Sequence, residues 1–140
     1  LEDDIAGRIV VESNNTKIDG RGHVLIGDGD GFGLLLTNLS DVTLVNLTIS
    51  NFEIGIKVNL ATNITLSNVR IIGIPNSIGI WIVQSNATSL EQIVIQNCRE
   101  GILFEHSTNV TVNGTNLIKS LAGIGVISSD AVRVMDVGIY

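Results

Sequence analysis

The chain has almost no cysteine, proline or aromatic residues. Cys98 is the single cysteine among 140 residues, so no disulfide can form within the chain, and a small fold held together by disulfides is excluded. Pro75 is the single proline, and aromatic residues make up 4% of the chain, whereas hydrophobic residues make up 44%. The apolar content is therefore mostly Ile, Val and Leu, which are typical of strands buried on at least one face.

Basic residues are also scarce. The chain has 8 Lys and Arg against 14 Asp and Glu, which gives a net charge of −6, and it has no cluster of Lys or Arg. This balance argues against nucleic acid and anionic membrane surfaces as partners. No apolar run approaches the length of a membrane-spanning helix, and no amphipathic helical pattern is visible. We therefore expect an all-β chain that does not insert into a membrane.

The sequence does contain a repeat. Glycines recur at spacings of 22, 24, 22 and 22 residues, and apolar residues stand one and three positions after each of them. These repeat glycines are Gly33, Gly55, Gly79, Gly101 and Gly123. A fixed period of this size indicates a solenoid, in which each coil is buried only against its neighbours. One two-residue insertion between Ile71 and Gly79, at Pro75-Asn76, accounts for the longer spacing.

Two further short strands per coil keep the same spacings, and in one coil they begin at Val42 and Leu47. Residues i and i+2 of each strand share one face and are nearly all aliphatic, while the residues between them are mixed and face outward. Equivalent strands of successive coils must run in the same direction. We therefore predict a parallel β-helix with three short strands per coil, about 22 residues per coil and about six coils.

The same repeat predicts the corners of the coils. A row between the first two strands of each coil begins with Asn46 and Asn68 and continues with Gln92, Gly114 and Asp136. Asn, Asp and Gly tolerate a left-handed backbone, so we predict a tight corner there, with amides that hydrogen-bond from coil to coil. We place the five repeat glycines at the other sharp corner for the same steric reason.

We expect residues 1–140 to form a single β-helix domain. Within it, residues 1–32 form an irregular N-terminal coil, with core positions at Ile9, Val11, Ile18, Val24 and Ile26. Residues 33–140 form regular coils, the last of which is incomplete. The chain opens at Leu1 without Met and stops at Tyr140 in the middle of the pattern, so we expect it to be a segment of a longer protein.

Three segments carry a resemblance to a known family: Ile18-Asp19-Gly20-Arg21-Gly22-His23, the stretch from Val42 to Asn51, and Asn109-Val110-Thr111-Val112. They resemble the right-handed parallel β-helix repeat family of the pectate-lyase-like superfamily, and most closely its NosD-like and carbohydrate-binding/sugar-hydrolase group. The resemblance implies a right-handed, single-stranded parallel β-helix. Members of the superfamily include lyases, hydrolases, epimerases, tailspikes, adhesins and surface-layer proteins, so the resemblance does not settle function.

We predict no catalytic or metal-binding residues in this chain. Glycoside hydrolysis needs two carboxylates flanking the bond, and the outward strand positions of the regular coils hold no Asp or Glu. NosD-like proteins are often linked to copper, but His23, His106, Cys98 and Met135 fall in different rows. We therefore expect no metal site and no cofactor. The acidic loop 27–31 lacks the further ligands of a calcium loop, so a flexible turn is favoured there.

One outward row differs from the others because it is flat and partly apolar. It contains Leu35, Lys57, Trp81 and Leu103, on the strand that follows each repeat glycine. An exposed tryptophan on a flat sheet can stack on a sugar ring or anchor a partner chain. The alternative is that a loop or a flanking domain covers it.

Acceptor sequences for N-glycosylation are dense in this chain. Six candidate sites begin Asn-x-Ser/Thr, namely Asn14, Asn38, Asn63, Asn86, Asn109 and Asn113. Asn46 begins a seventh such sequence, but we assign it to the corner row. The fold itself places Asn at corners and Thr on the strand that follows, and this arrangement produces Asn-x-Thr sequences without any need for a glycan. The pattern by itself therefore does not decide whether these sites are glycosylated.

These features favour a structural or adhesive β-helix module of a secreted or cell-surface protein, with a periplasmic location as the alternative. The expected partners are a polysaccharide or glycan, or a second copy of the chain that stacks on an open end of the β-helix. The alternative function is part of a polysaccharide-active enzyme (a lyase, hydrolase or epimerase) whose catalytic residues lie outside this segment. The lack of acids on the outward rows favours the non-enzymatic interpretation.

Overall fold

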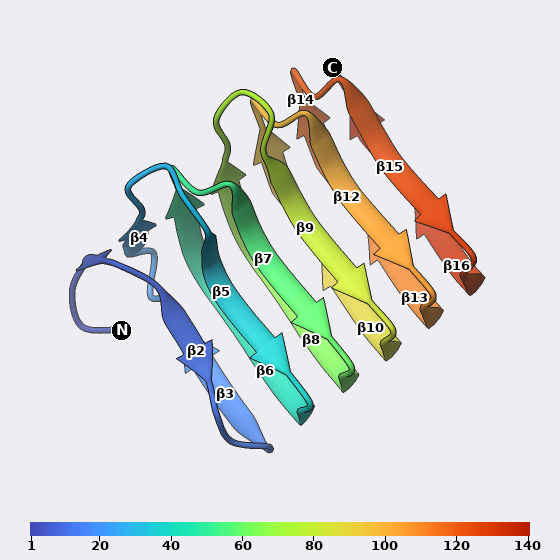
Figure 1. The fold of residues 1–140 in the computed structure, drawn as a ribbon, viewed down its shortest axis with the longest axis horizontal. Helices are drawn as coiled ribbons and strands as arrows, with labels where there is room; N and C mark the ends of the chain where they lie inside the picture. The colour runs from blue at the N-terminus through green and yellow to red at the C-terminus, as the bar shows by residue number, and fades with distance from the viewer.

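The computed structural model describes residues 1–140 as a solenoid of β-strands (Figure 1). No helix is present, and therefore none that is long and apolar enough to cross a membrane. The strands are β1 Ile5–Ala6, β2 Ile9–Val11, β3 Thr16–Asp19, β4 Val24–Ile26, β5 Phe32–Thr37, β6 Ser40–Ser50, β7 Ile54–Asn59, β8 Thr62–Ile72, β9 Ile78–Val83, β10 Asn86–Glu91, β11 Val94–Gln96, β12 Glu100–Glu105, β13 Thr108–Asn113, β14 Asn116–Ile118, β15 Ala122–Ile127, β16 Asp130–Met135 and β17 Gly138–Ile139.

The strands form two sheets, and every strand pair is parallel. The six-stranded sheet has the order β2-β5-β7-β9-β12-β15, so each neighbour comes from the next coil. The eleven-stranded sheet follows the path β1-β4-β6-β8-β10-β13-β16, with β3, β11, β14 and β17 paired beside it. Figure 1 shows the six-stranded sheet in front and the other sheet behind it. The prediction of an all-β parallel solenoid is confirmed.

The spacing of the repeat in the sequence sets the register of the strands in the sheets. Leu35 pairs with Lys57, Lys57 with Trp81, and Trp81 with Leu103, so the steps are 22, 24 and 22 residues. The extra two residues lie in the turn at residues 73–77, between β8 and β9, where Pro75 stands. The single insertion that the sequence predicted is therefore confirmed.

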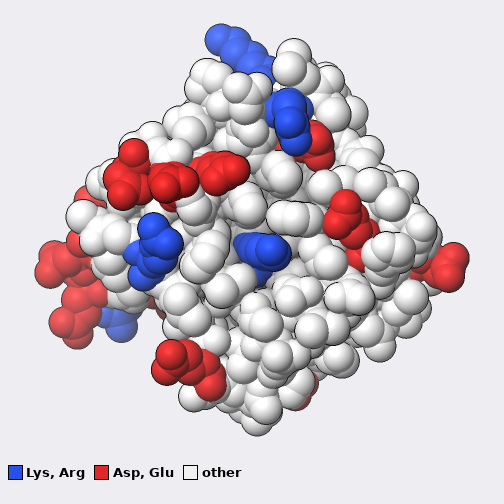
Figure 2. Space-filling view, viewed as in Figure 1, with Lys and Arg blue, Asp and Glu red and all other residues white.

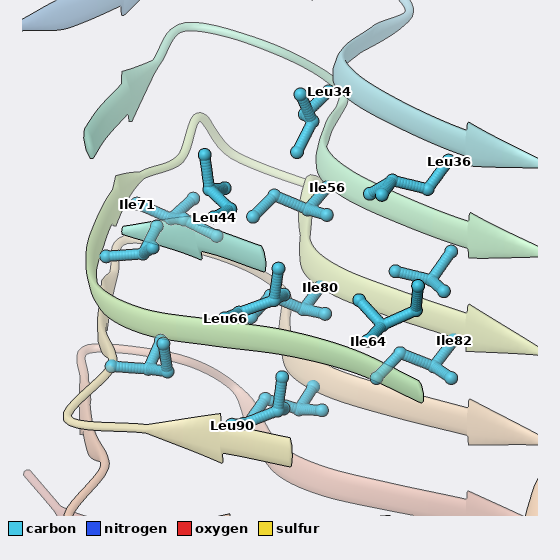
Figure 3. Close-up of a cluster of buried hydrophobic side chains, with 14 of the residues drawn as sticks. Leu34, Leu36, Leu44, Ile56, Ile64, Leu66, Ile71, Ile80, Ile82 and Leu90 are labelled. Carbon is cyan, nitrogen blue, oxygen red and sulfur yellow. The ribbon is translucent and has the colours of Figure 1, made fainter. Parts of the chain in front are cut away.

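The core lies between the two sheets and consists of aliphatic side chains stacked in rows. Buried residues form one hydrophobic cluster of 28 members. Figure 3 shows Leu34, Ile56 and Ile80 following one another along the axis, with Leu66 and Leu90 coming from the opposite sheet. Fully burying one such side chain stabilises the fold by roughly 1.5–3 kcal/mol, so each coil depends on the coils that cover it.

In two coils the first and second strands are joined. Strands β6 and β8 have 11 residues each and continue through the predicted corner. Asn46 and Asn68 nevertheless have left-handed φ angles of 56° and 51°, so the chain bends at each while pairing continues on both sides. Later coils break at the corner as predicted, for example into β10 and β11.

The corner row itself is as predicted. All five of its residues have positive φ angles: Asn46, Asn68, Gln92, Gly114 and Asp136. Asn68 Nδ2 donates a hydrogen bond to Asn46 Oδ1 at 2.7 Å, and Asn46 Nδ2 donates one to Asp19 Oδ1 at 3.1 Å. We call Asp19, Asn46 and Asn68 the amide ladder. It ends at Asn68, because the Gln92 side chain makes no such bond.

The repeat glycines do not turn the chain in the way that we expected. Gly33, Gly55, Gly79, Gly101 and Gly123 each occupy the second position of a strand of the six-stranded sheet, and none has a positive φ. A Cβ atom on Gly55 would lie 2.6 Å from the carbonyl oxygen of Gly79 and 2.8 Å from Ile71 Cγ2. The row is glycine because no side chain fits between the core and the next coil, and not because the backbone is left-handed.

The N-terminal coil agrees only in part with the sequence prediction. Ile9 pairs with Leu34 and Ile18 with Leu44, as expected. In β4, however, the prediction of Val24 and Ile26 as core residues is wrong. Leu25 is fully buried, whereas Ile26 is 44% exposed. The turn at Arg21 and Gly22, both with positive φ, precedes β4 and shifts the inside–outside alternation by one residue.

Candidate functional site

The row that we predicted as a ligand-binding stripe lies on the outer face of the six-stranded sheet. Leu35, Lys57, Trp81 and Leu103 stand in direct register on β5, β7, β9 and β12, and all are half-buried. Strand β2 extends the row with Val10, which pairs with Leu35 and is 50% exposed. The sequence analysis missed Val10 because the N-terminal coil does not keep the 22-residue period.

Trp81 is held in place from both sides. The Lys57 ammonium nitrogen lies 4.3 Å from the centroid of the Trp81 ring, within the range of a cation–π interaction. The indole Nε1–H of Trp81 donates a hydrogen bond to Glu105 Oε2 at 3.1 Å. Three coils thus contribute one side chain each, and we call these residues the Lys57–Trp81–Glu105 cluster.

Sequence reasoning did not include Glu105 in this site. Glu105 lies two residues after Leu103 on β12, so it faces the same way and pairs with Val83, two residues after Trp81. The signal was available, because a strand with an outward residue at i also faces outward at i+2. The expectation that the outward strand positions hold no Asp or Glu is therefore wrong for β12, because each strand also faces outward two residues beyond its central position.

The cluster lies in a flat and largely uncharged surface. Phe32, Ile54 and Ile78 form a neighbouring half-buried row on the same strands, and the Arg8 guanidinium lies 5.4 Å from the Phe32 ring centroid. Figure 2, viewed onto this sheet, shows charged residues as separate groups within a mostly uncharged face. Such a face suits a ligand that presents both apolar patches and hydroxyl groups.

The acidic residues do not gather into a metal-sized group, and the carboxylates of the 27–31 loop and of β12 each have partners of their own. Asp28 Oδ1 accepts a hydrogen bond from the Asp30 backbone N–H at 3.4 Å, and Asp30 Oδ1 accepts one from the Gly31 N–H at 2.9 Å. These carboxylates therefore stabilise the turn of the 27–31 loop. Glu100 Oε1 pairs with the guanidinium of Arg99 at 2.9 Å.

The four side chains considered for a metal lie apart. No group of three His, Cys, Asp or Glu side chains is close enough to hold one metal ion. His23 Nδ1 lies 3.3 Å from Asp4 Oδ1, while His106 occupies an exposed left-handed corner. Cys98 is buried beside Ser77, and this burial raises the pKa of its thiol. Met135 lies on the last coil and is 40% exposed.

All six candidate glycosylation asparagines are exposed: Asn14, Asn38, Asn63, Asn86, Asn109 and Asn113. They differ in how their amide nitrogens are used. Asn63 Nδ2 donates to Asp41 Oδ1, and Asn109 Nδ2 donates to Asn86 Oδ1 at 2.8 Å, whereas the other four nitrogens have no partner in the protein. Asn46, which we assigned to the corner, is half-buried within the amide ladder.

Residues 5–136 match the family model described as the right-handed β-helix region. The chain belongs to the right-handed β-helix family. This match covers nearly the whole solenoid and confirms both the fold class and the handedness that the resemblance implied.

A solved structure of the same fold agrees with this assignment. A putative glycosyl hydrolase from Parabacteroides merdae superposes with a TM-score of 0.79 at 10% sequence identity, over 94% of this chain and 77% of that chain. An alginate lyase from Paenibacillus sp. matches with a TM-score of 0.41 at 11% identity, over 95% of this chain and 88% of that chain. No curated protein matches the chain in sequence. At 10% identity, the likeness to the putative glycosyl hydrolase shows the fold alone.

Proposed function

We propose that this β-helix is a carbohydrate-binding structural or adhesive module of a secreted or cell-surface protein, and that it binds sugar on the outer face of the six-stranded sheet. The observation that carries the proposal is the Lys57–Trp81–Glu105 cluster. Its tryptophan is half-buried on a flat sheet and is oriented by a charged residue on each side.

The cluster suits a sugar for physical reasons. A tryptophan ring offers a large apolar surface for the C–H groups of a pyranose ring. Because the Lys57 ammonium lies over one face of this ring, a pyranose would stack on the opposite face. Lys57 and Glu105 then place a hydrogen-bond donor and an acceptor next to the ring, where sugar hydroxyl groups would lie. Because both residues already contact Trp81, little side-chain entropy is lost when a ligand binds.

The first test is a glycan array, followed by a polysaccharide pull-down with variants. Trp81→Ala should abolish retention of any glycan that the unaltered chain retains, because the stacking surface is removed. Tyr140→Ala is a matched control, since Tyr140 is an aromatic residue that is 77% exposed on the last coil, away from the cluster. Binding that survives Trp81→Ala, or no binding to any glycan, would refute the carbohydrate proposal.

The alternative function, part of a polysaccharide-active enzyme, is supported by the fold that this chain shares with a putative glycosyl hydrolase. Against it, the two carboxylates on the outer face of β12 are engaged, Glu100 with Arg99 and Glu105 with Trp81. Release of reducing ends or of unsaturated uronates by the 140-residue chain would reverse this ranking.

Self-association is a further proposal about partners. Val126, Val134 and Ile139 occupy inward rows of the last coil, yet they are 49%, 45% and 64% exposed because no coil covers them there. Either a following coil or a second copy of the chain would bury these side chains. A strictly monomeric mass in light scattering would argue against stacking of copies.

A further inference from the structure

A concave surface lies on the other sheet, at the corner where β6 and β8 bend. It is a groove of about 190 Å³. Its lining includes Asn46 and Asn68 of the amide ladder, Gln92 of the next coil, and Thr48 and Arg70. It is separate from the Lys57–Trp81–Glu105 cluster, which lies on the six-stranded sheet.

The register explains how these side chains meet. Thr48 pairs with Arg70 and Arg70 with Val94, so these three residues form one row along the axis. The left-handed corner residues form a parallel row two positions earlier in each coil. Since neighbouring coils are about 4.8 Å apart, the groove offers one guanidinium beside a line of amides.

Arg70 is a positive charge without a protein partner. Its residue is exposed, and the only ion pairs of the structure join His23 to Asp4 and Arg99 to Glu100. The row neighbours of Arg70, Thr48 and Val94, carry no charge. In a chain with net charge −6, an unpaired guanidinium among the lining residues of a groove leaves a local site for an anion.

The amides beside Arg70 also have free hydrogen-bonding capacity. Asn68 uses one N–H in the bond to Asn46, so its second N–H and its carbonyl oxygen are without a partner in the protein. The Gln92 side chain makes no hydrogen bond within the protein. The groove can therefore hold an anionic group at Arg70 and hydroxyl groups along the amide row.

We propose that this groove is a second ligand site, which binds a sugar chain carrying carboxylate or sulfate groups. Arg70 donates to the anionic group, in the two-pronged arrangement that guanidinium groups form with carboxylate and sulfate oxygens. Asn68 and Gln92 hydrogen-bond to hydroxyl groups of the adjoining sugar units. The inference is independent of the function proposed for Trp81, because the two sites share no residue.

Calorimetric titration at low salt tests the site with three probes: tetragalacturonate, a fully sulfated tetrasaccharide and uncharged cellotetraose. We expect at least one anionic probe to bind, its affinity to fall as salt is added, and Arg70→Gln to weaken it about tenfold or more. Arg70→Lys should give an intermediate loss, since lysine keeps the charge but not the paired donors. The probe that binds identifies the anionic group.

Two control variants make the outcome decisive. Arg133→Gln removes another exposed, unpaired arginine outside the groove and should leave the affinity unchanged. The second control is a Trp81→Ala background for all titrations, which removes binding at the proposed carbohydrate site, so that the remaining affinity belongs to the groove. Binding of neither anionic probe, equal binding of cellotetraose, or an Arg70→Gln affinity equal to that of the unaltered chain would overturn the proposal.

Discussion

The coils before the Pro75 turn and the coils after it use different side chains, at different corners, to link one coil to the next. Before the turn, the amide ladder joins coils at the corner within β6 and β8, and the other corner, after β5 and β7, carries apolar Leu39 and Ala61. After the turn, the amide ladder stops, and the other corner carries a row of serines: Ser85, Ser107 and Ser129.

The serine row is a continuous hydrogen-bonded ladder. Ser107 Oγ donates to the Glu105 carbonyl at 3.0 Å and accepts from the Ser85 N–H at 3.2 Å. Ser85 Oγ in turn accepts from the Ala61 N–H at 3.2 Å. Ser85 and Ser107 are buried, whereas Asn68 of the amide ladder is exposed. One 22-residue repeat thus accommodates two different cross-links, and the buried one is expected to contribute more to stability.

The largest effect should come from the glycine row, which both halves share. A Cβ atom on Gly101 would lie 2.6 Å from the Gly123 carbonyl oxygen, where backbone cannot move aside easily. Gly101→Ala should lower the free energy of unfolding by roughly 3 kcal/mol in denaturant titration. Gly114→Ala is the control, since a Cβ atom on Gly114 would make only ordinary contacts, the nearest at 3.7 Å, but its φ is +63°, and it should cost about 1 kcal/mol. Equal losses would show that packing does not explain the glycine row.

The next largest effect should come from the serine ladder. Ser107→Ala leaves the buried Ser85 N–H without its acceptor, so we expect a loss of about 2 kcal/mol in the free energy of unfolding. Ser129→Ala, at the exposed end of the ladder, should cost less. If Asn68→Ala lowers the free energy of unfolding as much as Ser107→Ala does, the burial of the serine ladder does not make it more stabilising than the amide ladder.

A smaller effect, of opposite sign, is expected at a core threonine found only after the turn. Thr115 is fully buried with an unpaired Oγ1, and its equivalents before the turn are Leu47 and Val69. Thr115→Val replaces the hydroxyl by a methyl group of the same shape and should raise the free energy of unfolding by about 1 kcal/mol. Destabilisation by this variant would mean that the hydroxyl has a partner, such as a buried water.

The smallest effect on stability is expected at Asp19, the first residue of the amide ladder, and it depends on pH. The Arg21 backbone N–H, followed by the Asn46 amide, lowers the pKa of Asp19 below its ordinary value of 3.8. A carboxyl with a lowered pKa stabilises the fold above its unfolded pKa, and this stabilisation is lost as the pH falls below about 3.8 through the folded pKa. Asn46→Ala should raise the Asp19 pKa in an NMR titration, while Asn68→Ala, one rung further, should change it little.

The sequence predicted the fold well because a solenoid repeats one local rule. Alternation of apolar and mixed residues assigned the faces, and the 22-residue period assigned the register of Trp81 between Lys57 and Leu103. The prediction failed at Leu25 because the turn at Gly22 breaks the alternation there. The sequence-based explanation of the repeat glycines was also wrong. Glycine is selected both where the backbone is left-handed and where a Cβ atom has no space, and the sequence does not distinguish the two.

By itself, the sequence determined the parallel β-helix, its period, its core rows and its Asn corners. These depend on neighbours within one strand or on the same position in the next coil. Only the tertiary structure decided which polar side chains meet: Glu105 with Trp81, the serines with backbone of the preceding coil, and Arg70 with an amide-lined groove. The physical reason is that these contacts depend on side-chain reach and on the bend of the corner, which the period does not encode.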